Sequence, residues 1–218
     1  MELKNAKINF LGDSITEGVG TSGVGYRYCD LIARKYGLAE MRNYGISGTR
    51  FAKNTAKTDP PSFDLDFCMR AKEMDPDADA VVVFGATNDF GHGDAPIGQP
   101  TDRTNDTFWG ACHVLMTELI EMYPGKPIVF LTPLHRLSES NPCGDCKPAP
   151  VGTLEEYIRI LKTVAEFYSL PVCDLWSAGL LQPKVPIIQE RFVPDGLHPN
   201  DAGHVILAER VGKFLETL

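Results

Sequence analysis

The chain of 218 residues lacks any apolar run long enough to cross a bilayer, and residues 1–5 do not lead into the apolar core of a signal peptide. It also lacks an excess of positive charge. Lys and Arg number 21 against 29 Asp and Glu, which gives a formal net charge of −8, and the basic residues are scattered. These absences predict a cytoplasmic protein with no membrane span and no nucleic-acid partner. They give no prediction of the oligomeric state.

The six cysteines are dispersed and do not form the pattern of a disulfide scaffold. Two of them, Cys143 and Cys146, make a C-x-x-C pair in a proline-rich stretch. Such a pair can bind zinc or cycle as a redox couple, but zinc needs two more ligands and no second C-x-x-C exists. We interpret the pair as two thiols or a local disulfide, and we predict no metal and no cofactor.

The sequence shows no internal repeat and no linker, so we predict one domain over residues 1–218. Strand and helix patterns alternate along the chain, which is typical of a three-layer α/β/α fold whose parallel sheet has helices on both faces. Long loops are expected over 86–103 and 132–152, and a further loop between the fifth strand and Pro194. The five expected strands lie at 8–11, 40–44, 80–84, 128–131 and 172–175.

Ser14 stands where the first strand ends, in Gly12-Asp13-Ser14. The carboxyl edge of an open α/β sheet is where ligands bind, and we expect the hydroxyl to start a loop there. A serine becomes a nucleophile only with a base, an orienter for that base and donors for the oxyanion. Asp195 and His198 are three residues apart, so the carboxylate can hold Nδ1 while Nε2 takes the serine proton. An isolated D-x-x-H is also common as a loop cap.

Two further strand ends offer oxyanion donors. Gly48 follows the second strand, where glycine lets a backbone N–H approach a ligand closely. Asn88 follows the third strand and carries a side-chain amide. In the flavodoxin-like strand order 2-1-3-4-5 the first three strands are neighbours, so these groups would meet Ser14.

These motifs resemble the SGNH (GDSL) hydrolase family, because Gly12-Asp13-Ser14, Gly48, Asn88-Asp89 and Asp195-x-x-His198-Pro199 occur in the family's order. The resemblance implies that Ser14 is the nucleophile, His198 the base and Asp195 its orienter. It also implies an oxyanion hole formed by Ser14, Gly48 and Asn88. The family usually has glycine two residues before the asparagine, where this chain has Ala86.

Other polar and aromatic residues near these motifs are candidates for substrate contact: Asp13, Phe90, His92, His135 and Arg136. His135 and Arg136 follow the fourth strand and therefore face the same edge as Ser14. The alternative for this pair is that it anchors its loop.

The expected function is hydrolysis of small carboxylic esters through an acyl-enzyme. The loops are polar, which favours a short-acyl (acetyl) esterase acting on a carbohydrate or polyol. A lysophospholipase or long-chain lipase is the alternative, and a non-catalytic carbohydrate-binding module on the same fold is a further one. Residues 18–23 also match G-x-G-x-x-G, but they lie too far past the first strand for a dinucleotide site.

Overall fold

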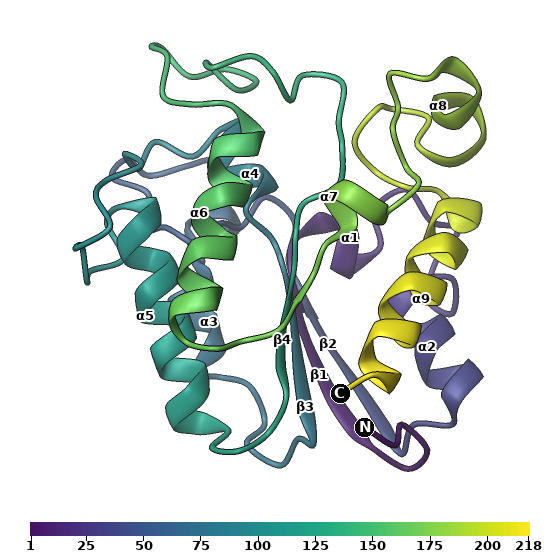
Figure 1. The fold of residues 1–218 in the computed structure, drawn as a ribbon. Helices are drawn as coiled ribbons and strands as arrows, with labels where there is room; N and C mark the ends of the chain where they lie inside the picture. The colour runs from purple at the N-terminus through teal and green to yellow at the C-terminus, as the bar shows by residue number, and fades with distance from the viewer.

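In the computed structural model, which describes residues 1–218, five parallel strands form one sheet in the order β2-β1-β3-β4-β5 (Figure 1). Both the parallel sheet and its strand order confirm the prediction. The strands are β1 (Lys7–Gly12), β2 (Glu40–Gly45), β3 (Ala80–Phe84), β4 (Ile128–Leu131) and β5 (Val172–Cys173).

Helices cover both faces of the sheet. One face packs against two helices, α2 (Tyr28–Tyr36) and α9 (Asp201–Glu216) (Figure 1). The other packs against three helices, α3 (Phe67–Ala71), α5 (Phe108–Met122) and α6 (Leu154–Phe167). A 3₁₀ helix, η1 (Pro61–Asp64), precedes α3.

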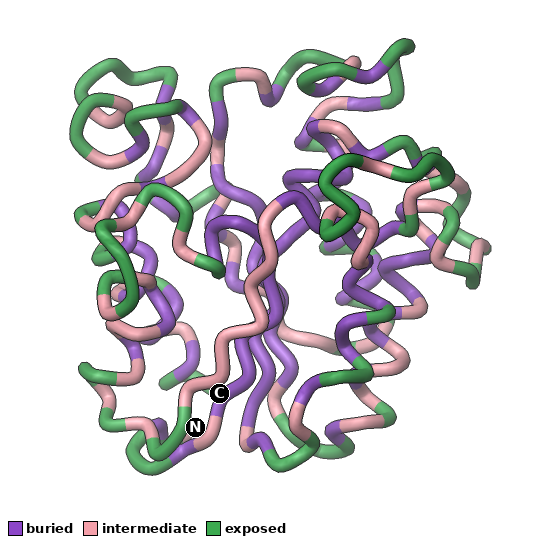
Figure 2. Tube along the Cα trace, turned by 180° about the vertical axis from the view of Figure 1, so that it is seen from behind, coloured by how far each residue is buried: buried purple, intermediate pink, exposed green.

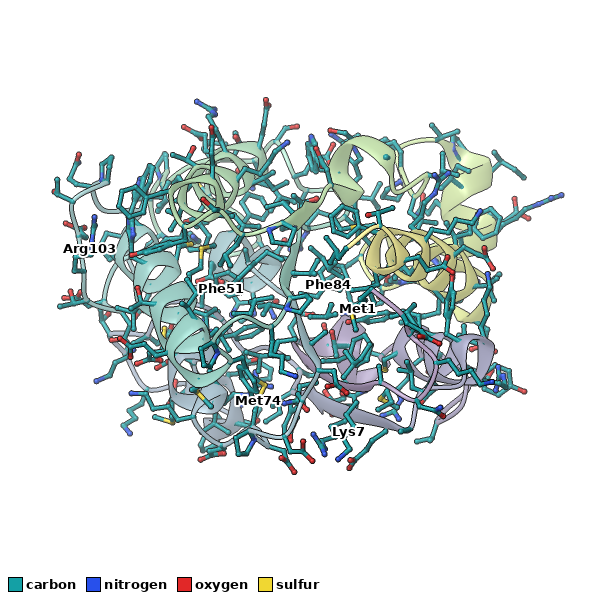
Figure 3. All side chains as sticks on the ribbon, turned by 60° about the horizontal axis from the view of Figure 1, so that its bottom comes forward. Met1, Lys7, Phe51, Met74, Phe84 and Arg103 are labelled. Atoms are coloured by element: carbon teal, nitrogen blue, oxygen red, sulfur yellow. The ribbon has the colours of Figure 1, made fainter.

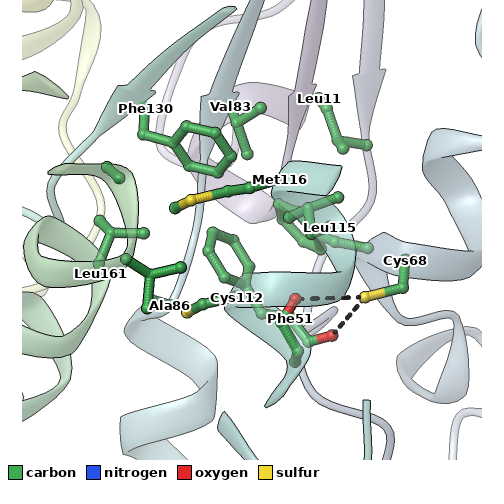
Figure 4. Packing of buried hydrophobic residues seen from close by; sticks show 14 of the residues in the cluster. Leu11, Phe51, Cys68, Val83, Ala86, Cys112, Leu115, Met116, Phe130 and Leu161 are labelled. Carbon is green, nitrogen blue, oxygen red and sulfur yellow. Dashed lines mark hydrogen bonds between the residues drawn. The ribbon is translucent and has the colours of Figure 1, made fainter. Parts of the chain in front are cut away.

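The core is divided into two clusters by the sheet, whose central strands are buried on both faces (Figure 2). In β3 the side chains alternate, so Val83 belongs to one cluster and Phe84 to the other. Figure 3 labels Phe84 and also Phe51, which belongs to the cluster beneath α3, α5 and α6. In that cluster the Cys68 thiol donates to Phe51 O at 3.7 Å (Figure 4).

Four short helices lie at the carboxyl edge of the sheet, opposite the end where the two termini meet (Figure 1). They correct the expectation that Ser14, residues 86–103 and the segment after β5 belong to loops throughout. The helices are α1 (Ser14–Glu17), α4 (Thr87–Gly91), α7 (Leu175–Ala178) and α8 (Pro186–Phe192).

The fifth strand is shorter than predicted. It ends at Cys173 because the Asp174 carboxylate accepts a hydrogen bond from Ser177 N at 3.1 Å and so starts α7. No helix of the structure combines the length and the apolar character needed to cross a membrane. The single domain over 1–218 and the cytoplasmic location stay predictions.

Helix α1 packs directly on the ends of β1 and β2, where both strands finish in glycine. A Cβ atom built on Gly45 would lie 2.1 Å from Glu17 N, and one on Gly12 would lie 2.0 Å from Thr16 Oγ1. The first of these clashes is with backbone, which cannot rotate away. Glycine at the end of β2 therefore sets how closely α1, and with it Ser14, approaches the sheet.

We expect Gly45→Ala to lower the free energy of unfolding by about 3 kcal/mol, because overpacking against fixed atoms costs about 1–3 kcal/mol and occasionally more. Gly125→Ala is the matched control, since Gly125 has φ +75° and open space around its Cα. The control should lose only about 1 kcal/mol to backbone strain. Equilibrium unfolding in urea measures both variants, and equal losses would contradict the close packing of α1.

Candidate active site

Ser14, His198 and Asp195 form one continuous hydrogen-bond chain. Ser14 is the first residue of α1, and its Oγ lies 2.9 Å from His198 Nε2. On the other side of the ring, His198 Nδ1 lies 2.7 Å from Asp195 Oδ2. The structure thus brings together three side chains that the sequence separates by up to 184 positions.

The hydrogen bonds of Asp195 fix both the ring and its tautomer. The carboxylate also accepts from the backbone N–H of His198 at 2.7 Å and of Leu197 at 2.9 Å. Burial alone would raise the pKa of Asp195, but these hydrogen bonds and the His198 ring hold it below its usual value. The ionised carboxylate keeps a proton on Nδ1, so Nε2 presents its lone pair to the Ser14 hydroxyl and can accept its proton.

The glycine-rich run 18–23 packs against the turn that carries His198. A Cβ on Gly20 would lie 2.6 Å from Pro199 O, so the two loops touch through their backbones. Ser22 strengthens the contact by donating from its N and its Oγ to the Asp201 carboxylate, at 2.8 and 2.6 Å. Gly20 and Ser22 therefore help to position the His198 turn.

Three N–H donors come from three neighbouring strand ends. The backbone N–H groups of Ser14 and Gly48 have no acceptor within the chain. Gly48 has φ +75°, a left-handed conformation that glycine adopts without strain. The Asn88 amide donates to Thr49 O at 3.0 Å, which fixes the orientation of Nδ2 and leaves its second N–H free of protein acceptors. Donors of this kind can stabilise an oxyanion.

The backbone conformation of Ala86 shows how the chain accommodates an alanine where the family usually has glycine. It precedes α4 with φ +73°, the left-handed conformation that glycine adopts without strain. The alanine therefore takes the backbone conformation that a glycine would favour, and α4 begins directly after it. Asn88 is thereby held 6% exposed, against Thr49.

The buried carboxylate of Asp89 ties α4 to the segment that follows Gly48. It accepts from the backbone N–H groups of Phe51 at 3.0 Å and Ala52 at 2.9 Å. Burial raises the pKa of Asp89 to about 6, while these hydrogen bonds and the nearby Arg50 oppose that rise. The carboxylate therefore couples the positions of Gly48 and Asn88.

The loop over 132–152 caps the carboxyl end of α4, a role that the sequence did not reveal. Lys147 Nζ donates to Asp89 O at 2.6 Å, and Asp145 N donates to Gly91 O at 2.7 Å. Arg136 bonds both carboxylate oxygens of Asp145, at 2.7 and 2.6 Å. Cationic side chains at the C-terminal end of a helix interact favourably with its unpaired carbonyl groups. This loop therefore stabilises the helix that carries Asn88.

The predicted substrate contacts divide by burial. Asp13, Phe90 and Arg136 are 1%, 0% and 5% exposed, and their roles as substrate contacts stay predictions. Asp13 caps α1 by accepting from Ile15 N at 3.0 Å, and burial raises its pKa to about 7. His92 and His135 are both partly exposed.

His135 fits the alternative of a loop anchor. Its Nδ1 lies 2.9 Å from Glu139 Oε2, and its ring packs against that of Trp176, tilted by 31° with centroids 3.7 Å apart. Arg136 anchors the same loop through Asp145. No group of three or more His, Cys, Asp or Glu side chains is arranged to hold a metal ion, and Cys143 and Cys146 are both free thiols.

Comparison with known proteins identifies the family of this chain. The model of the GDSL-like lipase/acylhydrolase family matches residues 10–206. A GDSL lipase of Mycobacterium tuberculosis is 24% identical over 208 residues, 94% of this chain and 79% of that protein. A Lactobacillus plantarum crystal structure is 28% identical with a TM-score of 0.83, covering 98% of each chain. A lipase/acylhydrolase structure from Enterococcus faecalis is 22% identical with a TM-score of 0.64, covering 97% of this chain and 96% of its own.

The family model spans most of the chain, including all the positions described above, and confirms the resemblance drawn from the motifs. The protein belongs to the GDSL-like lipase/acylhydrolase family and is a carboxylic ester hydrolase.

Proposed function

We propose that this ester hydrolase works through an acyl-enzyme on Ser14. The observation that carries the proposal is the chain of short hydrogen bonds from Ser14 through His198 to Asp195, at 2.9 and 2.7 Å. As Oγ attacks the ester carbonyl, His198 Nε2 takes the hydroxyl proton, and Asp195 stabilises the resulting imidazolium. His198 then gives that proton to the departing alcohol oxygen.

The developing oxyanion is bound by the N–H groups of Ser14 and Gly48 and by the amide of Asn88. This assignment is supported by the two backbone donors that have no acceptor in the chain and by the fixed Asn88 amide. In the second half of the reaction a water takes the place of the alcohol. His198 removes its proton, and the same three donors bind the second oxyanion. His198 then returns the proton to Ser14 Oγ as the carboxylic acid leaves.

We propose a short acyl group, such as acetyl, on a carbohydrate or other polyol. A long acyl chain needs a continuous apolar trough, which gains about 0.8 kcal/mol per buried methylene. The two long loops at the site offer little apolar surface for one. Phe90 and Leu134 are buried in the core, Ile97 packs against it, and of their large apolar residues only Leu137 and Val151 are exposed.

One observation favours the alternative of a longer acyl chain. The loop after α1, which touches the His198 turn through Gly20, exposes three apolar side chains, Val19, Val24 and Tyr26. Val24 is 80% exposed, and an apolar side chain so exposed can contact a lipid substrate. The substrate-length experiment below decides between the two.

Ser14→Ala should abolish ester hydrolysis and labelling by a fluorophosphonate while the protein stays folded, since no other group can form the acyl-enzyme. Ser62→Ala is the control, because Ser62 is exposed and its side chain bonds no residue of the site. That variant should keep hydrolysis within a few-fold of the wild type. An unlabelled and inactive wild type would instead support the non-catalytic binding module.

Asn88→Ala should lower kcat by about 10²- to 10³-fold with little change in KM, as expected when one oxyanion donor is removed. Asn88→Asp keeps the shape of the side chain but has no amide donor, so it should lose at least as much. Steady-state kinetics on one acetyl ester measure both variants. A change confined to KM would place Asn88 in ground-state binding.

The acyl preference is tested with acetyl, butyryl, octanoyl and palmitoyl esters of one alcohol. We expect kcat/KM to fall beyond butyryl and to be insensitive to Val24→Ser. A rise toward the long chains that Val24→Ser reverses would establish the long-chain alternative and leave the role of Ser14 untouched.

A further inference from the structure

His92 lies beside Gly48 and Asn88, two of the three residues of the proposed oxyanion hole. It follows α4 directly, and the backbone N–H groups of His92 and Gly93 donate to Asn88 O at 3.0 and 2.8 Å. Its ring lies against that of Phe63, with centroids 5.7 Å apart. The Phe63 ring in turn covers Gly48, where a Cβ would approach it to 2.3 Å. The packed rings of Phe63 and His92 therefore extend from Gly48 to the end of the helix that carries Asn88.

A buried arginine fixes the tautomer of this histidine. Arg50 Nη1 lies 2.9 Å from His92 Nδ1. A guanidinium can only donate hydrogen bonds, so Nδ1 must accept, and the ring proton must be on Nε2. Arg50 is 1% exposed and also donates through Nη2 to Phe63 O, which prevents the guanidinium from turning away.

The same surroundings keep the ring neutral. Burial and the positive charge of Arg50 lower the pKa of His92 to about 4, and Arg136 and Lys147 act in the same direction. Asp145 opposes them. At neutral pH the ring is therefore a donor through Nε2 and cannot supply a positive charge.

The Nε2–H group of His92 has no acceptor within the chain. It makes no hydrogen bond to the protein, and it is not among the buried polar atoms that lack a partner. Since the ring is partly exposed, this N–H faces solvent on the side away from Arg50. A donor that is fixed in direction, neutral and open to solvent is suited to bind a neutral oxygen of a ligand.

We propose that His92 Nε2–H determines specificity by donating a hydrogen bond to a substrate oxygen outside the scissile ester group. This inference rests on the proposed function, because the ligand is the ester that Ser14 cleaves. The oxygen is a hydroxyl, ether or carbonyl, in either the alcohol or the acyl half of the substrate. A hydrocarbon ester has no such oxygen and gains nothing from His92.

The test compares matched esters with and without the extra oxygen. Cyclohexyl acetate is paired with a monoacetylated methyl xyloside for the alcohol half, and ethyl butyrate with ethyl methoxyacetate for the acyl half. His92→Phe keeps an aromatic ring beside Phe63 but removes the donor. It should lower kcat/KM for the oxygenated ester of one pair by about 3- to 10-fold, the effect of one neutral hydrogen bond.

The hydrocarbon ester of that pair should change by less than about twofold in His92→Phe, and His92→Gln, which keeps a donor, should recover most of the loss. The pair that responds identifies the half of the substrate that His92 contacts. Equal losses for oxygenated and hydrocarbon esters would overturn the proposal in favour of a structural role, as would no loss in either pair.

Two measurements separate this proposal from the catalytic one. In a Ser14→Ala background, binding of the intact oxygenated ester should weaken by a similar factor when His92→Phe is added. Ring ¹⁵N chemical shifts should show His92 protonated on Nε2 alone from pH 6 to pH 9. Protonation on Nδ1, or titration of the ring in that range, would overturn the assignment of a fixed donor even if Ser14 proves to be the nucleophile.

Discussion

The two hydrogen bonds that the Asp89 carboxylate accepts from Phe51 N and Ala52 N hold the site together. They join the segment after β2, which carries Gly48, to the helix after β3, which carries Asn88. A buried carboxylate is costly, as the rise of its pKa to about 6 shows, and the N–H groups and Arg50 offset part of that cost. Lys147 caps the same helix by donating to Asp89 O.

The sheet and the main site residues could be predicted because they depend on local sequence and on general rules of topology. Apolar runs located all the strands except the second, whose residues 40–44 are mostly polar. Parallel connection required the carboxyl ends of the strands to share one edge. The residues Ser14, Gly48 and Asn88 follow three strands that are neighbours in the sheet. Asp195 and His198 lie on one turn, so their spacing allowed the pairing, and the resemblance to the family favoured it over a loop cap.

The conformation and capping of α4 could not be predicted, because they depend on contacts between residues far apart in the sequence. Helix α4 begins directly after Ala86, whose left-handed backbone conformation could not be predicted from an alanine. Its cap comes from Lys147, some sixty positions along the chain. Phe90 stands two residues after Asn88, yet the helical turn directs its ring into the core, where Tyr157 packs against it. Residue type and proximity to a motif therefore could not distinguish a substrate contact from a core residue.

Two histidines at the carboxyl edge of the sheet, His198 and His92, differ in chemistry because their Nδ1 atoms have different hydrogen-bond partners. At His198 the partner is the Asp195 carboxylate, which stabilises the imidazolium and suits Nε2 to take up a proton. At His92 the partner is the Arg50 guanidinium, which disfavours the imidazolium and keeps the proton on Nε2. One ring is thus suited to transfer protons and the other to donate a hydrogen bond. The sequence shows Asp195 three residues from His198, but Arg50 reaches His92 across 42 positions, so only the fold separates their chemistry.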